Sequence, residues 1–219
     1  MNKAVIFDLD GTLFDSIVDI KDCMNRVLAT FGLAPHTEEE YKKFVGNGIY
    51  NLAKRSVGEE KDEKTVDEVY RKFLEEYSEH YMDKTRPYDG IFELVVNLKK
   101  KGIKLAVLSN KKQIYSENLC NKFFPDLFNI VIGDRDGMQR KPSREPVMHI
   151  LNYLDIAEEN AFIIGDSNVD IITAKNSGIS SIGCAWGFRG EEELKDAGAD
   201  YIAYTAGDIE DIVSEYFKL

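Results

Sequence analysis

Two aspartates stand two positions apart near the start of the chain, directly after a short apolar run. The run at residues 4–7 is typical of a strand buried on both faces, and Asp8, Asp10 and Gly11 follow it. Burying two carboxyl groups at the end of such a strand costs free energy unless a cation or hydrogen bonds compensate. The stretch therefore predicts a metal site or a catalytic site, with an ordinary Asp-Gly turn as the alternative.

After residue 86 the chain alternates between apolar strand patterns and amphipathic helix patterns. This alternation predicts an α/β fold in which helices cover both faces of a parallel sheet. Ligands bind beyond the carboxyl ends of such strands, so side chains that follow different strands are expected to meet at one edge. Further strands are expected at residues 103–108, 129–132, 161–164, 180–185 and 201–203.

Polar side chains follow three of these later strands. They comprise a hydroxyl–amide pair, a lysine and two acids: Ser109, Asn110, Lys141, Asp166 and Asp170. A lone Ser-Asn or Lys-Pro pair is weak evidence, because such pairs are common in turns. Together with the first two aspartates, however, the set suits phosphoryl transfer, in which a carboxylate attacks phosphorus while a metal neutralises charge.

Magnesium is the metal that this set of oxygen atoms favours, because Mg2+ prefers oxygen ligands and commonly takes only one or two carboxylates. Asp8, the backbone carbonyl of Asp10 and Asp166 could supply the protein ligands. Lys141 and the Ser109 hydroxyl could then hold the phosphoryl oxygens, over which charge spreads in the transition state.

Residues 16–85 interrupt the α/β core after its first strand and carry helical patterns throughout. A capping box begins at Thr37, and the charge run at residues 58–64 is interpreted as a solvated loop. The predicted domains are a discontinuous core, residues 1–15 and 86–219, and a helical insertion, residues 16–85. We expect the insertion to lie over the carboxyl edge of the sheet as a lid.

The composition is that of a globular chain with an acidic surface. The 219 residues are 43% hydrophobic and 31% charged, with a net charge of −11. This charge argues against nucleic-acid partners and disfavours anionic membranes, and no stretch reaches transmembrane length. Three cysteines without a CxxC pair favour a reducing cytoplasm. The expected partner is a small phosphorylated metabolite, and the expected state is a monomer or a homodimer.

Four motifs carry a resemblance to a known family over nearly the whole chain. They are DxDGTLxDS at residues 8–16, Ser109-Asn110, Lys141-Pro142, and GDSxxDI at residues 165–171. With this set the chain resembles the haloacid dehalogenase superfamily, and within it the phosphoglycolate phosphatase-like branch. The frequent KPxP form of the third motif is broken here by Arg144. The resemblance implies a Rossmann-like, doubly wound parallel sheet with an inserted α-helical cap domain.

The resemblance also implies catalytic and phosphate-binding roles. Asp8 would be the nucleophile that forms an aspartyl-phosphate. Asp10 would protonate the leaving alcohol and then act as the base that activates water. Ser109 and Lys141 would bind the phosphoryl group, with Asn110 beside them.

For the metal, the resemblance implies Mg2+ bound by Asp8, Asp10 and Asp166. Asp170 would be linked to the metal only through other groups and would orient Lys141.

Two further residues are assigned to the substrate side. Thr12 would orient Asp10 next to the phosphate. Gly48 lies in the stretch 46–48, where related caps carry their substrate loop, and would contact the substrate.

The predicted function is a Mg2+-dependent phosphatase that hydrolyses a small phosphomonoester, with phosphoglycolate as the leading candidate. Alternatives within the superfamily are a pyrophosphatase and a sugar-phosphate phosphatase or phosphomutase. The mutase is disfavoured because residues 46–50 offer no arginine, and a dehalogenase is disfavoured by Asp10. An alternative of another class is a receiver-like phospho-acceptor signalling domain, but receivers are much shorter and lack an inserted cap.

Overall fold

The computed structural model describes residues 2–58 and 62–219, and the chain divides into two compact units. One unit comprises Met1–Phe14 with Pro87–Leu219, and the other comprises Asp15–Arg86. Each junction lies one residue from the boundary expected from the sequence. The role of the helical unit as a cap stays a prediction.

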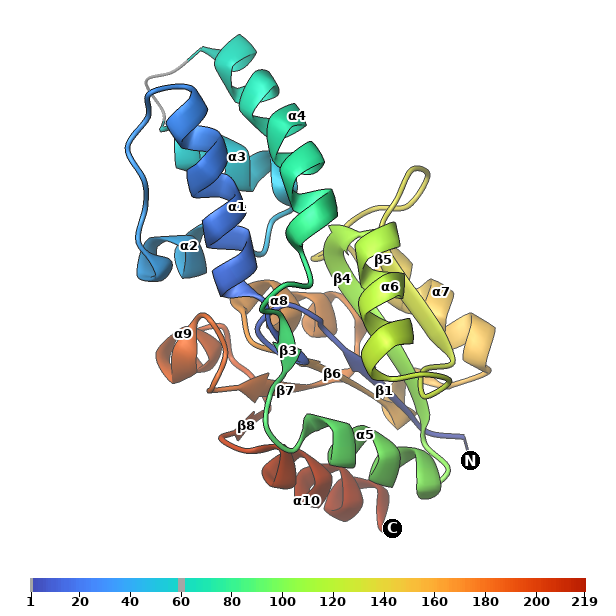
Figure 1. Ribbon diagram of the computed structural model, residues 1–219. Helices are drawn as coiled ribbons and strands as arrows, with labels where there is room; N and C mark the ends of the chain where they lie inside the picture. Colours follow the sequence, from blue (N-terminus) through green and yellow to red (C-terminus); the bar gives the residue numbers. More distant parts are fainter. Residues whose placement is uncertain (1, 59–61) are drawn as a thin grey trace. The chain divides into compact units, whose positions relative to one another are not determined.

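The larger unit is built on a six-stranded sheet of order β5-β4-β1-β6-β7-β8 (Figure 1). Its strands are β1 (Ala4–Phe7), β4 (Lys104–Lys112), β5 (Ile130–Asp134), β6 (Ala161–Gly165), β7 (Ser180–Cys184) and β8 (Tyr201–Ala203). Neighbouring strands pair in parallel throughout, which confirms the predicted α/β class. Because β1 lies between β4 and β6, the residues that end these two strands flank the carboxyl end of β1.

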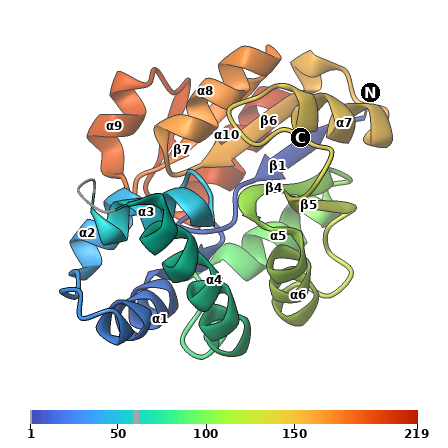
Figure 2. The same cartoon turned by 90° about the horizontal axis from the view of Figure 1, so that it is seen from above.

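Successive side chains of each strand point to opposite faces of the sheet, and helices pack against both faces in two layers. The helices are α5 (Ile91–Lys100), α6 (Gln113–Phe123), α7 (Glu145–Leu154), α8 (Asn168–Ser177), α9 (Gly190–Asp196) and α10 (Ala206–Phe217), with a short 3-10 helix η1 (Glu158–Asn160). On one face, Ile6 and Ile163 share a core cluster with Ile150 of α7. On the other face, Phe162 packs edge-on against Phe217 of α10. In Figure 2, α7 and α8 lie on one side of the sheet, and α5 and α6 lie on the other.

β4 is longer than the sequence predicts. The apolar run ends at Leu108, where the strand was expected to end, but β4 continues to Lys112. The continuation pairs with β5 between Lys112 and Asp134, after a shift in register. Ser109 and Asn110 therefore belong to the strand itself, between its paired positions Leu108 and Lys112.

The smaller unit consists of four helices: α1 (Ile17–Thr30), α2 (Glu38–Phe44), α3 (Ile49–Val57) and α4 (Glu63–His80). The capping box expected at Thr37 is confirmed, because its hydroxyl accepts the Glu40 N–H and the Glu40 carboxylate accepts the Thr37 N–H. Two short strands, β2 (Phe14–Asp15) and β3 (Arg86–Pro87), pair where the chain passes from one unit to the other.

The solvated loop predicted at residues 58–64 is too long at its carboxyl end. Helix α4 begins at Glu63, with Asp62 as the N-cap whose carboxylate accepts the Thr65 N–H. The remainder of that prediction includes residues 59–61, which lie outside the described residues.

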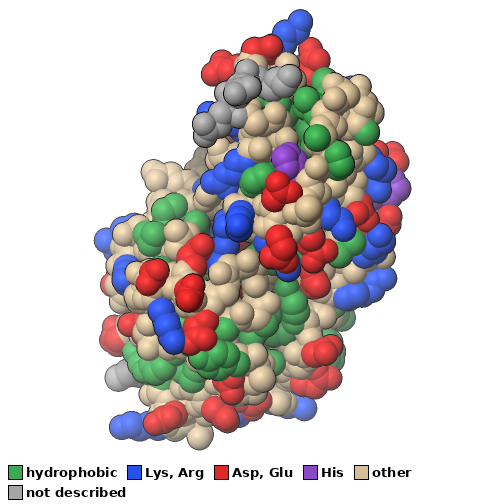
Figure 3. Space-filling model, turned by 90° about the vertical axis from the view of Figure 1, so that its left-hand side faces the viewer, with side chains coloured by type: hydrophobic (Ala, Val, Ile, Leu, Met, Phe, Trp, Pro, Cys, Tyr) green, Lys and Arg blue, Asp and Glu red, His purple; other side chains and the backbone are tan. Residues whose placement is uncertain are grey.

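The surface drawn in Figure 3 carries acidic and basic side chains interleaved rather than gathered by sign. The net charge of −11 is thus not concentrated in one field on this face. Within the described part of the chain, no helix is long and apolar enough to cross a membrane. Cys23, Cys120 and Cys184 are all buried and form no disulfide.

Candidate active site

The candidate nucleophile follows β1 and contacts the candidate phosphate-binding lysine. Oδ1 of Asp8 lies 2.8 Å from Nζ of Lys141, and the same ammonium donates to Oδ1 of Asp170 over 2.6 Å. Lys141 comes just before α7, and Asp170 lies in the first turn of α8. Ile6 faces the layer formed by α7 and α8. Asp8, two residues later, points to the same face of the sheet, and this explains why the three side chains meet.

Asp170 is held in place by the start of its own helix. Its Oδ2 accepts hydrogen bonds from the backbone N–H and the hydroxyl of Ser167, at 3.1 and 2.7 Å. Gly165 leaves the space for this carboxyl, because a Cβ there would lie 2.1 Å from Cγ of Asp170. Since Lys141 takes the other oxygen, the contacts suit a residue that orients Lys141.

Asp166 follows β6 and is enclosed by backbone. Its Oδ2 accepts the Phe188 N–H over 2.7 Å, and its Oδ1 lies 3.4 Å from the Thr12 hydroxyl, which donates to it. A Cβ on Gly11 would lie 2.3 Å from Oδ2 of Asp166, and one on Gly187 would lie 2.1 Å from its Cβ. Two glycines therefore let the loops after β1 and β7 approach the carboxylate closely.

Burial, together with the close approach of three acids and one base, shifts several pKa values. Burial raises the pKa of Asp8 to about 6, with the charge of Asp170 adding to the effect and Lys141 opposing it. Burial also raises the pKa of Asp166 well above its usual value, helped by the charges of Asp170 and Asp8. Burial alone would lower the pKa of Lys141, but the carboxylates of Asp170 and Asp8 outweigh it and raise the pKa.

These acids form a group suited to a divalent cation. One carboxylate oxygen from each of Asp8, Asp166 and Asp170 lies within 4.8 Å of the others. All the donors are oxygen atoms, as Mg2+ prefers, and burial, the main cause of the raised pKa values of Asp8 and Asp166, disfavours their charged forms unless a cation compensates. Because Lys141 and Ser167 engage Asp170, the residues that fit the ion directly are Asp8 and Asp166.

Asn110 bonds the main chain of Lys141 in both directions. Its Nδ2 donates to the Lys141 carbonyl over 3.1 Å, and its Oδ1 accepts the Lys141 N–H over 3.0 Å. The neighbouring Ser109 is 5% exposed, and its Oγ accepts the Lys111 N–H over 3.3 Å. The amide thus links β4 to the loop that supplies the ammonium, whereas its predicted contact with phosphate stays a prediction.

Asp10 has a partner that the sequence analysis missed. Nζ of Lys111 lies 3.0 and 3.2 Å from the two carboxylate oxygens of Asp10 and donates to both. The lysine side chain is 3% exposed, and that of Asp10 is 12% exposed. The available signal was a lysine directly after the hydroxyl–amide pair, in a segment that could extend a buried strand.

The remaining predicted residues lie in different parts of the molecule. Thr12 is fully buried, and its hydroxyl donates to Oδ1 of Asp166. Its predicted role of orienting Asp10 stays a prediction. Gly48 belongs to the helical unit, where it precedes α3 with φ 85°. Its contact with substrate stays a prediction.

Comparison with known proteins identifies the family of this chain. The family model described as haloacid dehalogenase-like hydrolase matches residues 5–184, a span that includes all of the clustered residues above. The chain belongs to this family. The predicted resemblance to the haloacid dehalogenase superfamily and its phosphoglycolate phosphatase-like branch is confirmed.

Three relatives illustrate the similarity of this haloacid dehalogenase-like hydrolase to known sequences and structures. Phosphoglycolate phosphatase of Neisseria meningitidis is 34% identical over 191 residues, which cover 85% of this chain and 81% of the relative. Phosphoglycolate phosphatase of Chromobacterium violaceum is 31% identical over 216 residues and covers 96% of both chains. A crystal structure from Lactobacillus delbrueckii subsp. bulgaricus, assigned to the phosphoglycolate phosphatases, is 32% identical with a TM-score of 0.93 and covers 97% of this chain and 99% of that one.

Proposed function

We propose that this hydrolase removes the phosphoryl group from a small phosphomonoester, with phosphoglycolate as the leading candidate, through a phospho-aspartate formed on Asp8. The chain is a phosphoric monoester hydrolase of the phosphoglycolate phosphatase-like branch. The observation that carries the mechanism is the contact of the Asp8 carboxylate with the buried ammonium of Lys141, next to Asp166. A nucleophile, a cation for phosphate and a metal ligand are thereby combined at one strand end.

In the first half-reaction, the Asp8 carboxylate forms a bond to phosphorus as the bond to the leaving oxygen breaks. Lys141, with the hydroxyl of Ser109, stabilises the charge on the phosphoryl oxygens. Asp10 delivers its proton to the leaving oxygen, so that a neutral alcohol departs. A bound Mg2+, held by Asp8, Asp166 and the backbone carbonyl of Asp10, would supply neutralising charge between the two anions.

In the second half-reaction, a water molecule attacks the phosphorus of the aspartyl-phosphate. Asp10, now a carboxylate, takes a proton from that water, and the bond between Asp8 and phosphorus breaks. Inorganic phosphate leaves, and both aspartates return to their starting states. The same residue thus gives a proton in one step and recovers it in the next.

Phosphoglycolate leads among substrates because both curated relatives described above carry that activity in their names. The helical unit, with Gly48 before α3, is the part of the chain to which we assign the choice of substrate. The residues that define the phosphoryl chemistry all lie in the other unit, and such chemistry serves any monoester.

The test is a panel of phosphoglycolate, pyrophosphate, β-glucose 1-phosphate and p-nitrophenyl phosphate, assayed with Mg2+ and after chelation. Phosphoglycolate should give the highest kcat/KM, and chelation should abolish turnover. Asp8→Asn should lose activity on every substrate, by about 10³-fold or more for the loss of a nucleophile. Substantial turnover by Asp8→Asn would overturn the covalent mechanism, whereas a preference for pyrophosphate or the sugar phosphate would reassign only the substrate.

A further inference from the structure

Lys111 is a buried lysine whose ammonium is not used by the mechanism above. Its side chain is 3% exposed, and Nζ donates to both oxygens of Asp10, at 3.0 and 3.2 Å. The two residues are separated by 101 positions in the sequence, so the folding of β4 beside β1 brings them together. Taking a lysine and an aspartate largely out of water is expensive, and a buried ion pair often contributes little net stability.

Hydrogen bonds and close packing fix the main chain of Lys111, from which its side chain extends. Its N–H donates to the Ser109 hydroxyl over 3.3 Å, and its carbonyl lies 3.4 Å from the Ser116 hydroxyl, which donates to it. Gly133 of β5 packs so closely that a Cβ there would lie 2.6 Å from the Lys111 carbonyl oxygen. The ammonium therefore extends from a fixed point toward Asp10.

The site contains two lysines with separate duties. Lys141 contacts Asp8 and Asp170, whereas Lys111 contacts Asp10. The nucleophile and the proton-transferring residue thus each have their own buried ammonium. A carboxylate that must meet first a leaving oxygen and then a water has to stay in one place through both steps.

We infer that Lys111 is a positioning residue that holds the Asp10 carboxylate where it exchanges a proton with the leaving group and with water. The inference rests on the proposed function, because it assigns Lys111 to the residue that carries the acid and base steps. Lys111 acts through Asp10 and does not bind the phosphoryl group.

The experiment compares Lys111→Met, Asp10→Asn and the double variant, with Lys101→Met as the matched control. Lys101 also forms a lysine–carboxylate pair, 2.8 Å from Glu210, but on the surface with 34% of its side chain exposed. Each variant is assayed on phosphoglycolate, which has a poor leaving group, and on p-nitrophenyl phosphate, which has a good one. Single-turnover rates separate the formation of the aspartyl-phosphate from its hydrolysis.

Lys111→Met should slow phosphorylation by phosphoglycolate about 10²-fold, as expected for a misplaced acid, and by the aryl phosphate only a few-fold. The affinity for inorganic phosphate as a competitive inhibitor should change less than about twofold, because Lys111 acts on Asp10 and not on the phosphoryl group. In the Asp10→Asn background, Lys111→Met should have no further effect, because its target is already disabled. Lys101→Met should match the wild type on both substrates.

Two results of these assays would overturn the inference. One is a full, multiplicative loss when Lys111→Met is added to Asp10→Asn. The other is a rise in KM confined to substrates that carry a carboxylate, which would make Lys111 a substrate-binding residue instead. Lys111→Gln, which keeps a donor without the charge, serves if the methionine variant does not fold, and its predicted loss is smaller with the same dependence on leaving group.

A crystal structure of the Lys111 variant gives a test that does not depend on turnover. The Asp10 carboxylate should leave the position it has in the wild type, and an unchanged position would also refute the inference. This readout distinguishes the two proposals: retained activity of Asp8→Asn would refute the proposed mechanism while leaving the position of Asp10 to be judged on its own.

Discussion

The absence of a Cβ on Gly11 leaves space for the carboxylate of Asp166 in the candidate metal site. Gly11 follows Asp10 with φ 86°, a backbone conformation that favours glycine, and it also lies against the carboxylate of Asp166. Glycine at this position thus provides both a positive φ and the space for a neighbouring carboxylate. The two requirements can be separated experimentally, because other glycines of the chain have a positive φ but no close neighbour.

Gly11→Ala should abolish Mg2+-dependent hydrolysis and lower the free energy of unfolding by about 1–3 kcal/mol, since a Cβ would lie 2.3 Å from Oδ2 of Asp166. Gly102→Ala is the control, because Gly102 has φ 79° and nothing within 4 Å of a Cβ. The control should show the backbone cost alone, about 1 kcal/mol, with normal activity. Urea unfolding and steady-state assays measure both, and equal effects of the two variants would contradict the steric explanation.

Asn110 allows a second prediction at the scale of one residue. Asn110→Ala leaves the buried N–H and carbonyl of Lys141 without the amide that bonds them. The expected cost is about 1–3 kcal/mol of stability, with weaker binding of inorganic phosphate because the ammonium of Lys141 is less well placed. Asn176→Ala is the control, since the exposed Asn176 amide donates over 2.8 Å to the carbonyl of Pro142, the residue that follows Lys141. Phosphate affinity unaltered by Asn110→Ala would contradict this positioning role.

At the scale of elements, the order of strands and helices in the core could be predicted from the sequence. Apolar runs such as 161–164 are buried on both faces, so their pattern does not depend on which strand pairs with which. The end of β4 could not be predicted, because it depends on pairing with β5. Asp8, Lys141 and Asp166 were found through strand ends, whereas Lys111 was missed because its partner is near only in three dimensions.

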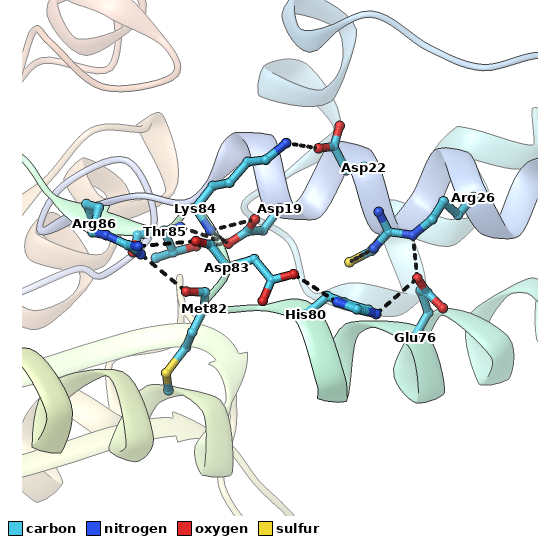
Figure 4. Close-up of polar contacts among 11 residues, drawn as sticks. Asp19, Asp22, Arg26, Glu76, His80, Met82, Asp83, Lys84, Thr85 and Arg86 are labelled. Atoms are coloured by element: carbon cyan, nitrogen blue, oxygen red, sulfur yellow. Dashed lines mark hydrogen bonds and ion pairs between the residues drawn. The ribbon is translucent and has the colours of Figure 1, made fainter.

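Another contact that depends on the fold joins the two ends of the helical unit. Asp19 of α1 is 3% exposed, and its carboxylate accepts hydrogen bonds from the Lys84 N–H, the Thr85 N–H and the Thr85 hydroxyl (Figure 4). A second acid of α1, Asp22, contacts the ammonium groups of Lys84, 2.7 Å away, and Lys21, 3.6 Å away, and its side chain is 29% exposed. The first contact fixes the main chain where it leaves the unit, and the second lies at the surface.

Asp19→Asn should therefore destabilise the helical unit by about 2–3 kcal/mol, because an amide nitrogen would face backbone N–H donors in a buried place. Asp22→Asn should cost less than about 1 kcal/mol, as is usual for an exposed ion pair. Hydrogen exchange measured by mass spectrometry should show faster exchange at residues 80–86 in the first variant only. Equal protection of that segment in the two variants would argue against the role of Asp19.

At the scale of the whole molecule, the cluster of Asp8, Asp166 and Asp170 destabilises the folded chain until a cation binds. Asp8 has a pKa of about 6 instead of 3.8, so the folded chain without metal binds this proton more tightly than the unfolded chain does. The resulting stability is fully present below about pH 4 and is lost as pH rises through about 6. Mg2+ binds the ionised carboxylates, so it competes with this proton. It therefore binds best at the pH values at which the metal-free chain is least stable.

The rise in Tm on adding Mg2+ should therefore be large at pH 8 and should shrink as pH falls through about 6. Asp166→Asn tests both the destabilisation by buried charge and the stabilisation by Mg2+, because it removes a buried charge and a metal ligand together. At pH 8 the variant without metal should melt above the metal-free wild type, and Mg2+ should no longer raise its Tm. Thermal melts from pH 5 to pH 8, with Mg2+ or EDTA, measure both. A rise in Tm that is constant across this range, or that survives Asp166→Asn, would show that the ion binds elsewhere.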